Sequence, residues 1–292
     1  MMDKNILLRS LFFVPAHVDR FFDNAVKSEA DALIFDLEDG VPIDKKQSAR
    51  ESLREKVSKL KKSHPVFVRL NAKETGLLEE DARAMALPAV DGFVLPKIRT
   101  ADDIKSFESL LAGLEEQGGL TKGKFACFPL IETAEAVLNI LDIARASKRI
   151  GGLIFGHEDY LLDIQGEHAP DNRNLLVPRS LIVMAARAAG CSPIDTPYLD
   201  IKNLEGCAKH VEESRELGFD GMLVLHPGQI KVANEGYSPS AEEIAQAEKI
   251  IRINEDAQKN DRNIAFAEGK FVAPPILKQA QFLLERAKRI NG

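Results

Sequence analysis

Short apolar runs alternate along this chain with longer segments in which apolar residues repeat at a helical period. Most of the runs are continuously apolar, as expected for strands that are buried on both faces. Eight runs can be counted, at residues 10–15, 32–37, 66–70, 92–96, 125–131, 152–155, 193–195 and 222–225. Strands that alternate with helices predict a parallel sheet.

Some of the intervening segments show the residue types that begin and end helices. A capping-box spacing occurs at residues 44–47 and again at residues 240–243. Pro178 opens a helical run that Gly190 ends, and proline near the start with glycine just past the end is the order that helices favour. These signals predict helices over the segments that they bound.

Eight strands with eight helices predict the α/β class and a closed (β/α)8 TIM barrel. An open doubly wound sheet is the alternative, but it would normally have a glycine-rich dinucleotide turn after the first strand, and this sequence has none. We expect the barrel over residues 1–235 and a C-terminal helical extension, or lid, over residues 236–292. In the extension we expect a polar loop at 256–263, an extended piece at 266–275 and a final helix at 276–290.

Charged or titratable residues follow the predicted strands, at the end of the barrel where catalytic groups stand. They are His17, Asp36, Glu38, Arg69, Lys97, Glu132, Asp159, Asp195 and His226. Charges at a barrel mouth carry a desolvation cost unless they are paired or hold a metal. The sequence therefore predicts an active site at this end.

The chemistry of these residues favours a magnesium site. Glu132 and Asp159 come from neighbouring strands and offer hard oxygen ligands, which together with waters and substrate oxygens suit Mg2+. The absence of a His or Cys cluster argues against zinc. Arg69 offers a planar fork for a substrate carboxylate.

Three further residues are predicted to support this site. Asp36 and Glu38 lie two residues apart on the same side of a strand, where they could orient Arg69 or hydrogen-bond metal-bound waters. Lys97 could pair with these carboxylates, and a Schiff-base role is the alternative for it. A divalent metal that chelates a 2-oxo or 2-hydroxy acid stabilises charge on oxygen as a carbon–carbon bond breaks or forms.

Composition limits the partners. The net charge of −6 argues against nucleic-acid binding. No apolar stretch reaches the roughly 18 residues that a membrane span needs, and Arg9 interrupts any signal-peptide core. The cysteines, Cys127, Cys191 and Cys207, have no metal or disulfide spacing, so we expect free thiols in a cytoplasmic protein without membrane or nucleic-acid partners.

Several motifs, in order, resemble those of a known family. Residues 9–15 (RSLFFVP) and 30–39 (ADALIFDLED) look like the opening of the citrate lyase beta subunit and of the related malyl-CoA and citramalyl-CoA lyases. The resemblance spans nearly the whole chain. It continues through 68–71 (VRLN), 95–97 (LPK), 131–133 (IET), 156–159 (GHED) and 225–229 (LHPGQ).

This resemblance implies the HpcH/HpaI aldolase and citrate lyase superfamily, with a (β/α)8 barrel, a C-terminal lid and a homotrimer or hexamer. It implies cleavage of a 3-hydroxy acyl-CoA to acetyl-CoA and an oxo acid, with Glu132 and Asp159 as ligands of Mg2+. The expected substrate-binding residues are Arg69, Glu132, Gly156, His157, Glu158 and Asp159. The expected catalytic residues are Asp36, Glu38, Arg69 and Lys97.

The sequence departs from the family at the lid. In the acyl-CoA lyases that it resembles, an aspartate of the lid moves a proton, whereas residues 269–275 read GKFVAPP here and Ala273 takes the aspartate's place. An alanine cannot move a proton. The alternatives to an acyl-CoA lyase are therefore a metal-dependent aldolase on a free 2-oxo-4-hydroxy acid, a thioesterase and a non-catalytic homologue.

Overall fold

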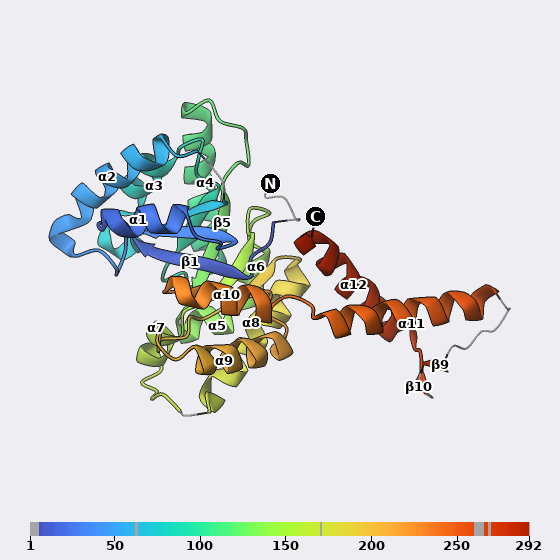
Figure 1. Ribbon diagram of the computed structural model, residues 1–292. Coiled ribbons are helices and arrows are strands. Elements are labelled where there is room, and N and C mark those ends of the chain that lie inside the picture. The colour runs from blue at the N-terminus through green and yellow to red at the C-terminus, as the bar shows by residue number, and fades with distance from the viewer. Residues whose placement is uncertain (1–5, 62–63, 170, 260–265, 268–269, 292) are drawn as a thin grey trace. The chain divides into compact units, whose positions relative to one another are not determined.

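The computed structural model describes residues 6–61, 64–169, 171–259, 266–267 and 270–291 (Figure 1). In this part of the chain, strands β1 to β8 hydrogen-bond in chain order and close into one barrel. The strands are β1 (Ser10–Pro15), β2 (Ala32–Asp36), β3 (Val66–Arg69), β4 (Gly92–Leu95), β5 (Ala126–Ile131), β6 (Gly152–Phe155), β7 (Ser192–Asp195) and β8 (Gly221–Val224).

Closure of the sheet is seen at the first strand, which pairs in parallel with both the second and the last. Leu11 lies opposite Ala32 of β2 on one side and opposite Leu223 of β8 on the other. The closed parallel barrel confirms the predicted (β/α)8 TIM-barrel class and excludes the open doubly wound sheet.

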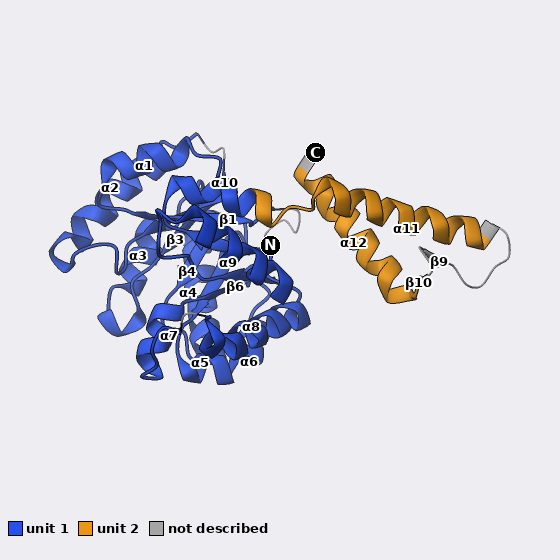
Figure 2. Ribbon diagram, turned by 60° about the horizontal axis from the view of Figure 1, so that its bottom comes forward, with its two compact units in different colours: residues 1–234 blue, residues 235–292 orange. Residues whose placement is uncertain are grey.

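Helices follow the strands and lie around the outside of the barrel (Figure 2). They are α1 (Asp19–Val26), α2 (Lys46–Ser58), α3 (Leu78–Met85), α4 (Ala101–Gln117), α5 (Ala134–Leu138), α6 (Ile140–Arg145), α7 (His157–Asp163), α8 (Leu176–Ala189), α9 (Leu204–Leu217) and α10 (Pro227–Gly236). Short 3-10 turns are η1 (Ile43–Lys45), η2 (Lys73–Thr75) and η3 (Arg173–Leu175). No helix in the described ranges is long and apolar enough to cross a membrane.

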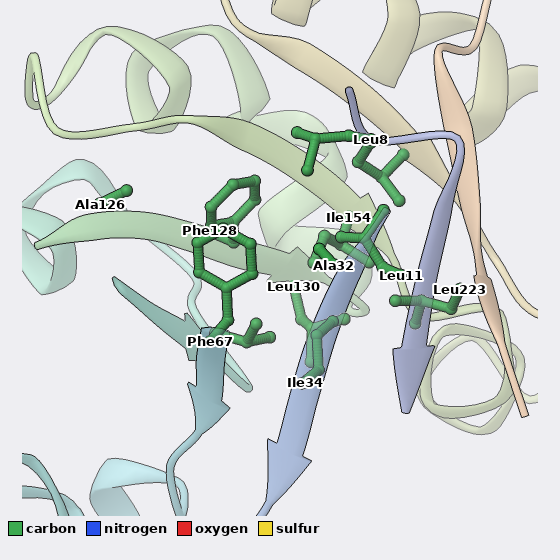
Figure 3. Close-up of a cluster of buried hydrophobic side chains, with 12 residues drawn as sticks. Leu8, Leu11, Ala32, Ile34, Phe67, Ala126, Phe128, Leu130, Ile154 and Leu223 are labelled. Carbon is green, nitrogen blue, oxygen red and sulfur yellow. The ribbon is translucent and has the colours of Figure 1, made fainter. Parts of the chain in front are cut away.

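The barrel interior is filled by apolar side chains that contact one another across the strands (Figure 3). Phe67 and Phe128 contact each other within it, with ring centroids 4.6 Å apart. The full cluster is Leu8, Leu11, Ala32, Ile34, Phe67, Val94, Ala126, Phe128, Leu130, Ile154, Ile194 and Leu223. The interior is therefore a packed core, and ligands can reach the barrel only at its ends.

Two predicted helix starts on the barrel were wrong in detail. The capping box at residues 44–47 does not form, because η1 precedes α2 and Gln47 donates to Glu51 instead, over 3.1 Å. Helix α8 begins at Leu176, two residues before Pro178, because η3 runs directly into it. Pro178 still lies in the first turn, where its missing N–H costs nothing.

The chain divides into two compact units, Met1–Asn234 and Glu235–Gly292. The second unit contains α11 (Ala241–Lys259) and α12 (Pro274–Asn291), with a short antiparallel pair of strands, β9 (Phe266–Ala267) and β10 (Lys270–Phe271). Its small core forms around Val272. Ser240 caps α11: its backbone N–H donates to the Glu243 carboxylate over 2.7 Å and its hydroxyl accepts from the Glu243 N–H over 3.1 Å, which confirms that predicted capping box.

The predictions for the middle of this second unit were partly wrong. Residues 256–259 continue α11 and are not a loop, while 260–263 lie outside the described residues. Pro274 and Pro275 begin α12 and are not extended, because proline suits the first helical turn.

Candidate active site

The inward-facing positions of the strands lead directly from the hydrophobic core to the polar residues at the carboxyl ends. Ile34 of β2 packs in the interior cluster, and Asp36 is the next inward position. Leu130 of β5 packs there too, and Glu132 follows it two residues later. In β3, Phe67 packs in the cluster and Arg69 is the next inward position. Because side chains alternate along a strand, this parity gathers these polar groups above the core.

Arg69 and Asp36 form a buried two-point ion pair. Nε and one terminal nitrogen of Arg69 donate to the two oxygens of Asp36 over 2.7 and 2.8 Å. Asp36 also accepts from the backbone N–H groups of Glu38 and Gly40, each over 2.8 Å. A Cβ at Gly40 would lie 2.4 Å from an Asp36 oxygen, so any larger residue there would displace this carboxylate. These contacts fix the guanidinium, which also lies over the Phe13 ring.

Glu38 joins this pair to Lys97. One Glu38 oxygen lies 3.0 Å from Arg69 and the other 3.6 Å from the Lys97 ammonium. Burial raises the pKa of Glu38 to about 7, against the attraction of Arg69. The structure thus brings Asp36, Glu38, Arg69 and Lys97 into one ion-pair network, and their catalytic roles remain predictions.

Lys97 adopts a left-handed backbone, with φ of 53°. This conformation costs roughly 1–2 kcal/mol in a residue with a Cβ. It points the Lys97 backbone N–H at Glu132, whose carboxylate accepts over 2.5 Å. Strain of this kind persists where surrounding structure holds it, and it concentrates at functional sites.

Glu132 is a buried carboxylate with little to offset its charge. It is 2% exposed, and burial together with the neighbouring negative charge of Asp159 raises its pKa to about 8. Gly156 leaves the space that Glu132 fills, since a Cβ there would lie 2.6 Å from a Glu132 oxygen. Within the described ranges, neither Glu132 nor Asp159 forms an ion pair with a lysine or arginine side chain. This oxygen donor set therefore fits a hard divalent cation.

His157 and Glu158, although next to Asp159 in sequence, form a separate group at the ends of β6 and β7. The Nδ1 atom of His157 is hydrogen-bonded to the Thr196 hydroxyl, and its Nε2 lies 2.8 Å from a Glu158 oxygen. Burial lowers the pKa of His157 to about 4. Their predicted part in substrate binding remains a prediction.

The sequence interpretation missed a cavity of about 180 Å3 beside this group, lined in part by His168, Tyr198 and His210. The neighbouring strand-end acid, Asp195, is paired with buried Arg179 over 2.5 Å. Part of the information was in the sequence, because Thr196 occupies the next inward position after β7, but a threonine alone indicates no chemistry. No pattern in the sequence shows that the histidines lie at this cavity.

A second cavity, of about 250 Å3, opens beside Lys97 between η2, α3 and the start of α4. Its lining combines the apolar side chains Leu95 and Phe107 with the charged side chains Lys73 and Asp103. A site with apolar walls and a few charged groups can hold a small polar molecule and its apolar extension.

Comparison with known proteins places the chain in one family. The family model described as HpcH/HpaI aldolase/citrate lyase matches residues 9–227. Citrate lyase subunit beta of Leuconostoc mesenteroides subsp. cremoris is 33% identical over 287 residues, which cover 98% of this chain and 95% of that protein. The (3S)-malyl-CoA thioesterase of Cereibacter sphaeroides is 31% identical, over 97% of this chain and 95% of its own length.

A solved structure is similar over almost the same extent. Protein CitE from Mycobacterium tuberculosis, in complex with magnesium, acetoacetate and coenzyme A, is 30% identical and superposes with a TM-score of 0.80. The match covers 97% of this chain and 99% of that one. These findings confirm the predicted resemblance and the prediction of a lyase-type enzyme, and the chain belongs to the HpcH/HpaI aldolase/citrate lyase family.

Proposed function

We propose that this chain is a Mg2+-dependent carbon–carbon lyase that cleaves a 3-hydroxy acyl-CoA of the malyl, citramalyl or citryl type to acetyl-CoA and an oxo acid. The observation that carries the proposal is buried Glu132 beside Asp159, two carboxylates without a lysine or arginine partner among the described residues. The magnesium, acetoacetate and coenzyme A held by the related CitE structure support it.

Glu132 and Asp159 would hold the Mg2+, which when bound supplies positive charge to the substrate oxygens. Arg69 would bind the substrate carboxylate. Two of its five N–H groups donate to Asp36 and one lies against Glu38, so two remain for a ligand. Asp36 would act as a positioning residue, because it holds the guanidinium at two points.

Glu38 would hold or move a proton. Its pKa of about 7 means that both protonation states are populated near neutrality, the condition that general acid–base catalysis favours. Lys97, 3.6 Å away, would stabilise the ionised form. A group of this kind is needed because Ala273 has no carboxylate that could move the proton. The cavity beside Lys97 offers room for the part of the substrate beyond the reacting atoms.

A thioesterase is the second candidate, and Ala273 together with the (3S)-malyl-CoA thioesterase relative favours it. Ala273 contributes its backbone carbonyl to the start of α12, where it accepts from the N–H groups of Ile276 and Leu277. It offers no side chain that could move the proton on the acetyl carbon. An aldolase that acts on a free 2-oxo-4-hydroxy acid would use a pyruvate enolate on the same metal and would not need the lid aspartate either.

An assay on malyl-CoA, citramalyl-CoA and citryl-CoA, with a free 2-oxo-4-hydroxy acid tested separately, distinguishes these functions when acetyl-CoA, free coenzyme A and oxo acid are followed together. Mg2+-dependent release of acetyl-CoA with an equal amount of oxo acid is the expected result. Release of free coenzyme A without an oxo acid would identify a thioesterase, and pyruvate from a free hydroxy acid would identify an aldolase. Each of those two results would contradict the lyase proposal.

The lid position gives a second test. We expect Ala273→Asp to raise acyl-CoA cleavage if the carboxylate lost from this position limits the reaction. An unchanged rate would show that another group, such as Glu38, has taken over its task. The homotrimeric or hexameric assembly and the cytoplasmic location remain part of this proposal.

A further inference from the structure

Two histidines and a glutamate converge near the ends of β6 and β7. One Glu158 oxygen lies 2.8 Å from Nε2 of His157 and 3.2 Å from Nε2 of His168. One ligand atom from each of the three side chains lies within 4.8 Å of the other two. Three donors at these separations can be bridged by one ion at about 2 Å from each.

The buried member of this triad is already oriented. The Thr196 hydroxyl is hydrogen-bonded to Nδ1 of His157, which leaves Nε2 directed at Glu158. A hydrogen bond to the remote ring nitrogen is the usual way in which a metal-binding imidazole is held. The Thr196 backbone N–H in turn donates to buried Asp195 over 2.9 Å. The orientation of His157 is therefore supported from within the barrel.

His168 is also held in place, although its side chain is exposed. The carbonyl of Glu167 before it accepts from the Asn174 side chain over 2.7 Å, and the carbonyl of Ala169 after it accepts from the Asn172 N–H over 3.0 Å. The imidazoles of His157 and His168 meet edge to face, with centroids 5.8 Å apart. Both histidines line the 180 Å3 cavity, so an ion bound by the triad would face that space.

We propose that His157, Glu158 and His168 form a second metal site, which takes a borderline divalent ion such as Zn2+ and leaves one coordination position open to the cavity. Two imidazoles and one carboxylate favour Zn2+, Co2+ or Ni2+ over Mg2+, which prefers oxygen ligands throughout. Binding requires neutral imidazoles and an ionised carboxylate at these three positions. The sequence argued against zinc because it shows no His or Cys cluster, whereas the fold brings together two histidines that lie eleven positions apart along the chain.

The proposal stands apart from the proposed lyase activity, and metal binding alone tests it. Zn2+ is titrated calorimetrically into the full-length Glu132→Gln variant, which lacks the carboxylate proposed to bind Mg2+, and into the unchanged chain with excess Mg2+. One Zn2+ site per chain is expected in both. His168→Asn should weaken it at least about 100-fold, more than the loss of an outer hydrogen-bond partner usually does. His226→Asn, which removes another exposed histidine, should leave the affinity unchanged.

Co2+ absorption in the visible region reports the ligands directly. An intense band typical of four or five ligands should appear with Co2+ alone and disappear in His168→Asn but not in His226→Asn. The proposal is overturned if Zn2+ does not bind, or if His168→Asn binds Zn2+ as tightly as the unchanged chain. Because His168 is largely exposed, its replacement should not disturb folding, which circular dichroism of the variant verifies.

Discussion

Two buried glutamates differ in how their charge is compensated: Glu115 of α4, which packs at the amino end of β5, and Glu132, which directly follows its carboxyl end. Glu115, near the amino end of the strand, is 1% exposed and accepts from both terminal nitrogens of Arg149, over 2.6 and 2.8 Å. It also accepts from the backbone N–H groups of Gly123 and Phe125. Although burial opposes ionisation, these partners lower its pKa. Glu132, at the carboxyl end, has one backbone donor and a raised pKa.

The difference separates a residue that holds the fold from one that is available to a ligand. A buried carboxylate that is fully paired is structural, and removal of its charge leaves its partner unpaired. A buried carboxylate with few cationic partners destabilises the ligand-free protein. A bound cation compensates its charge and removes this cost. The two ends of one strand thus show the division of a barrel into a stability face and a functional face.

The largest expected effect on stability comes from removing the charge of Glu115, the paired glutamate. Glu115→Gln leaves buried Arg149 with only the partly exposed Glu108, 3.5 Å away, as an ionised partner, and we expect a loss of up to about 3–5 kcal/mol in the free energy of unfolding. Denaturant unfolding measures it. Cleavage activity per folded molecule should not change, and an activity loss greater than the folded fraction explains would contradict the structural assignment of Glu115.

The matched substitution, Glu132→Gln, should lower activity and leave stability intact. Glu132→Gln keeps the shape of the side chain but removes the charge, so Mg2+-dependent turnover should fall by at least about 100-fold. The metal-free stability at pH 8 should stay equal or rise, because a buried charge is removed. Steady-state kinetics measures the turnover, and urea unfolding measures the free energy of unfolding. Full Mg2+-dependent activity in this variant would show that Glu132 is not a metal ligand.

The pH dependence should also separate the two glutamates. The pKa of Glu132 is raised from 4.5 to about 8, so the folded metal-free protein binds more protons than the unfolded chain between these values. Its contribution to stability therefore falls as the pH rises through this window. Glu115, with a lowered pKa, stabilises the fold above its unfolded pKa and loses this contribution as the pH falls. Thermal unfolding of the unchanged chain and both Gln variants checks these opposite signs, from pH 5 to 8 for Glu132 and below pH 4.5 for Glu115.

Mg2+ must displace the proton on Glu132, so its affinity should rise with pH. Between pH 6 and 8 we expect the Kd to fall about tenfold for each pH unit and to level off above 8. Calorimetric titration with Mg2+ at pH 6, 7 and 8 measures it. A Kd that is flat over this range would contradict a raised pKa at a magnesium ligand.

The smallest expected effect comes from crowding Glu132 without removing it. Gly156→Ala places a Cβ 2.6 Å from a Glu132 oxygen, so the carboxylate must move, and we expect Mg2+ affinity to fall by about tenfold. Gly113→Ala in α4 is the control, since a Cβ there meets nothing within 4 Å and should stabilise the helix by about 0.5–1 kcal/mol. Equal Mg2+ affinities in the two variants would contradict the proposed contact.

The barrel could be predicted from the sequence because strands buried on both faces are continuously apolar, and most of the eight runs are of this kind, although the seventh, at 193–195, is weak on its own. Glu132 and Asp159 could be named because strand ends in this fold gather at one mouth. The length of α11 could not be predicted, because residues 256–259 continue the helix although their polar composition suggests a loop. The strain at Lys97 and the contact of His157 with Thr196 were equally hidden, since both depend on tertiary contacts that no local pattern encodes.

The central claim is that the carboxyl end of β5 is a magnesium site, and calorimetric titration of Mg2+ at pH 8 tests it most directly. Three proteins are compared: the unchanged chain, Glu132→Gln and Glu115→Gln. We expect one Mg2+ site in the unchanged chain, the same site in folded Glu115→Gln, and none in Glu132→Gln. Equal Mg2+ binding by the unchanged chain and Glu132→Gln would contradict the claim.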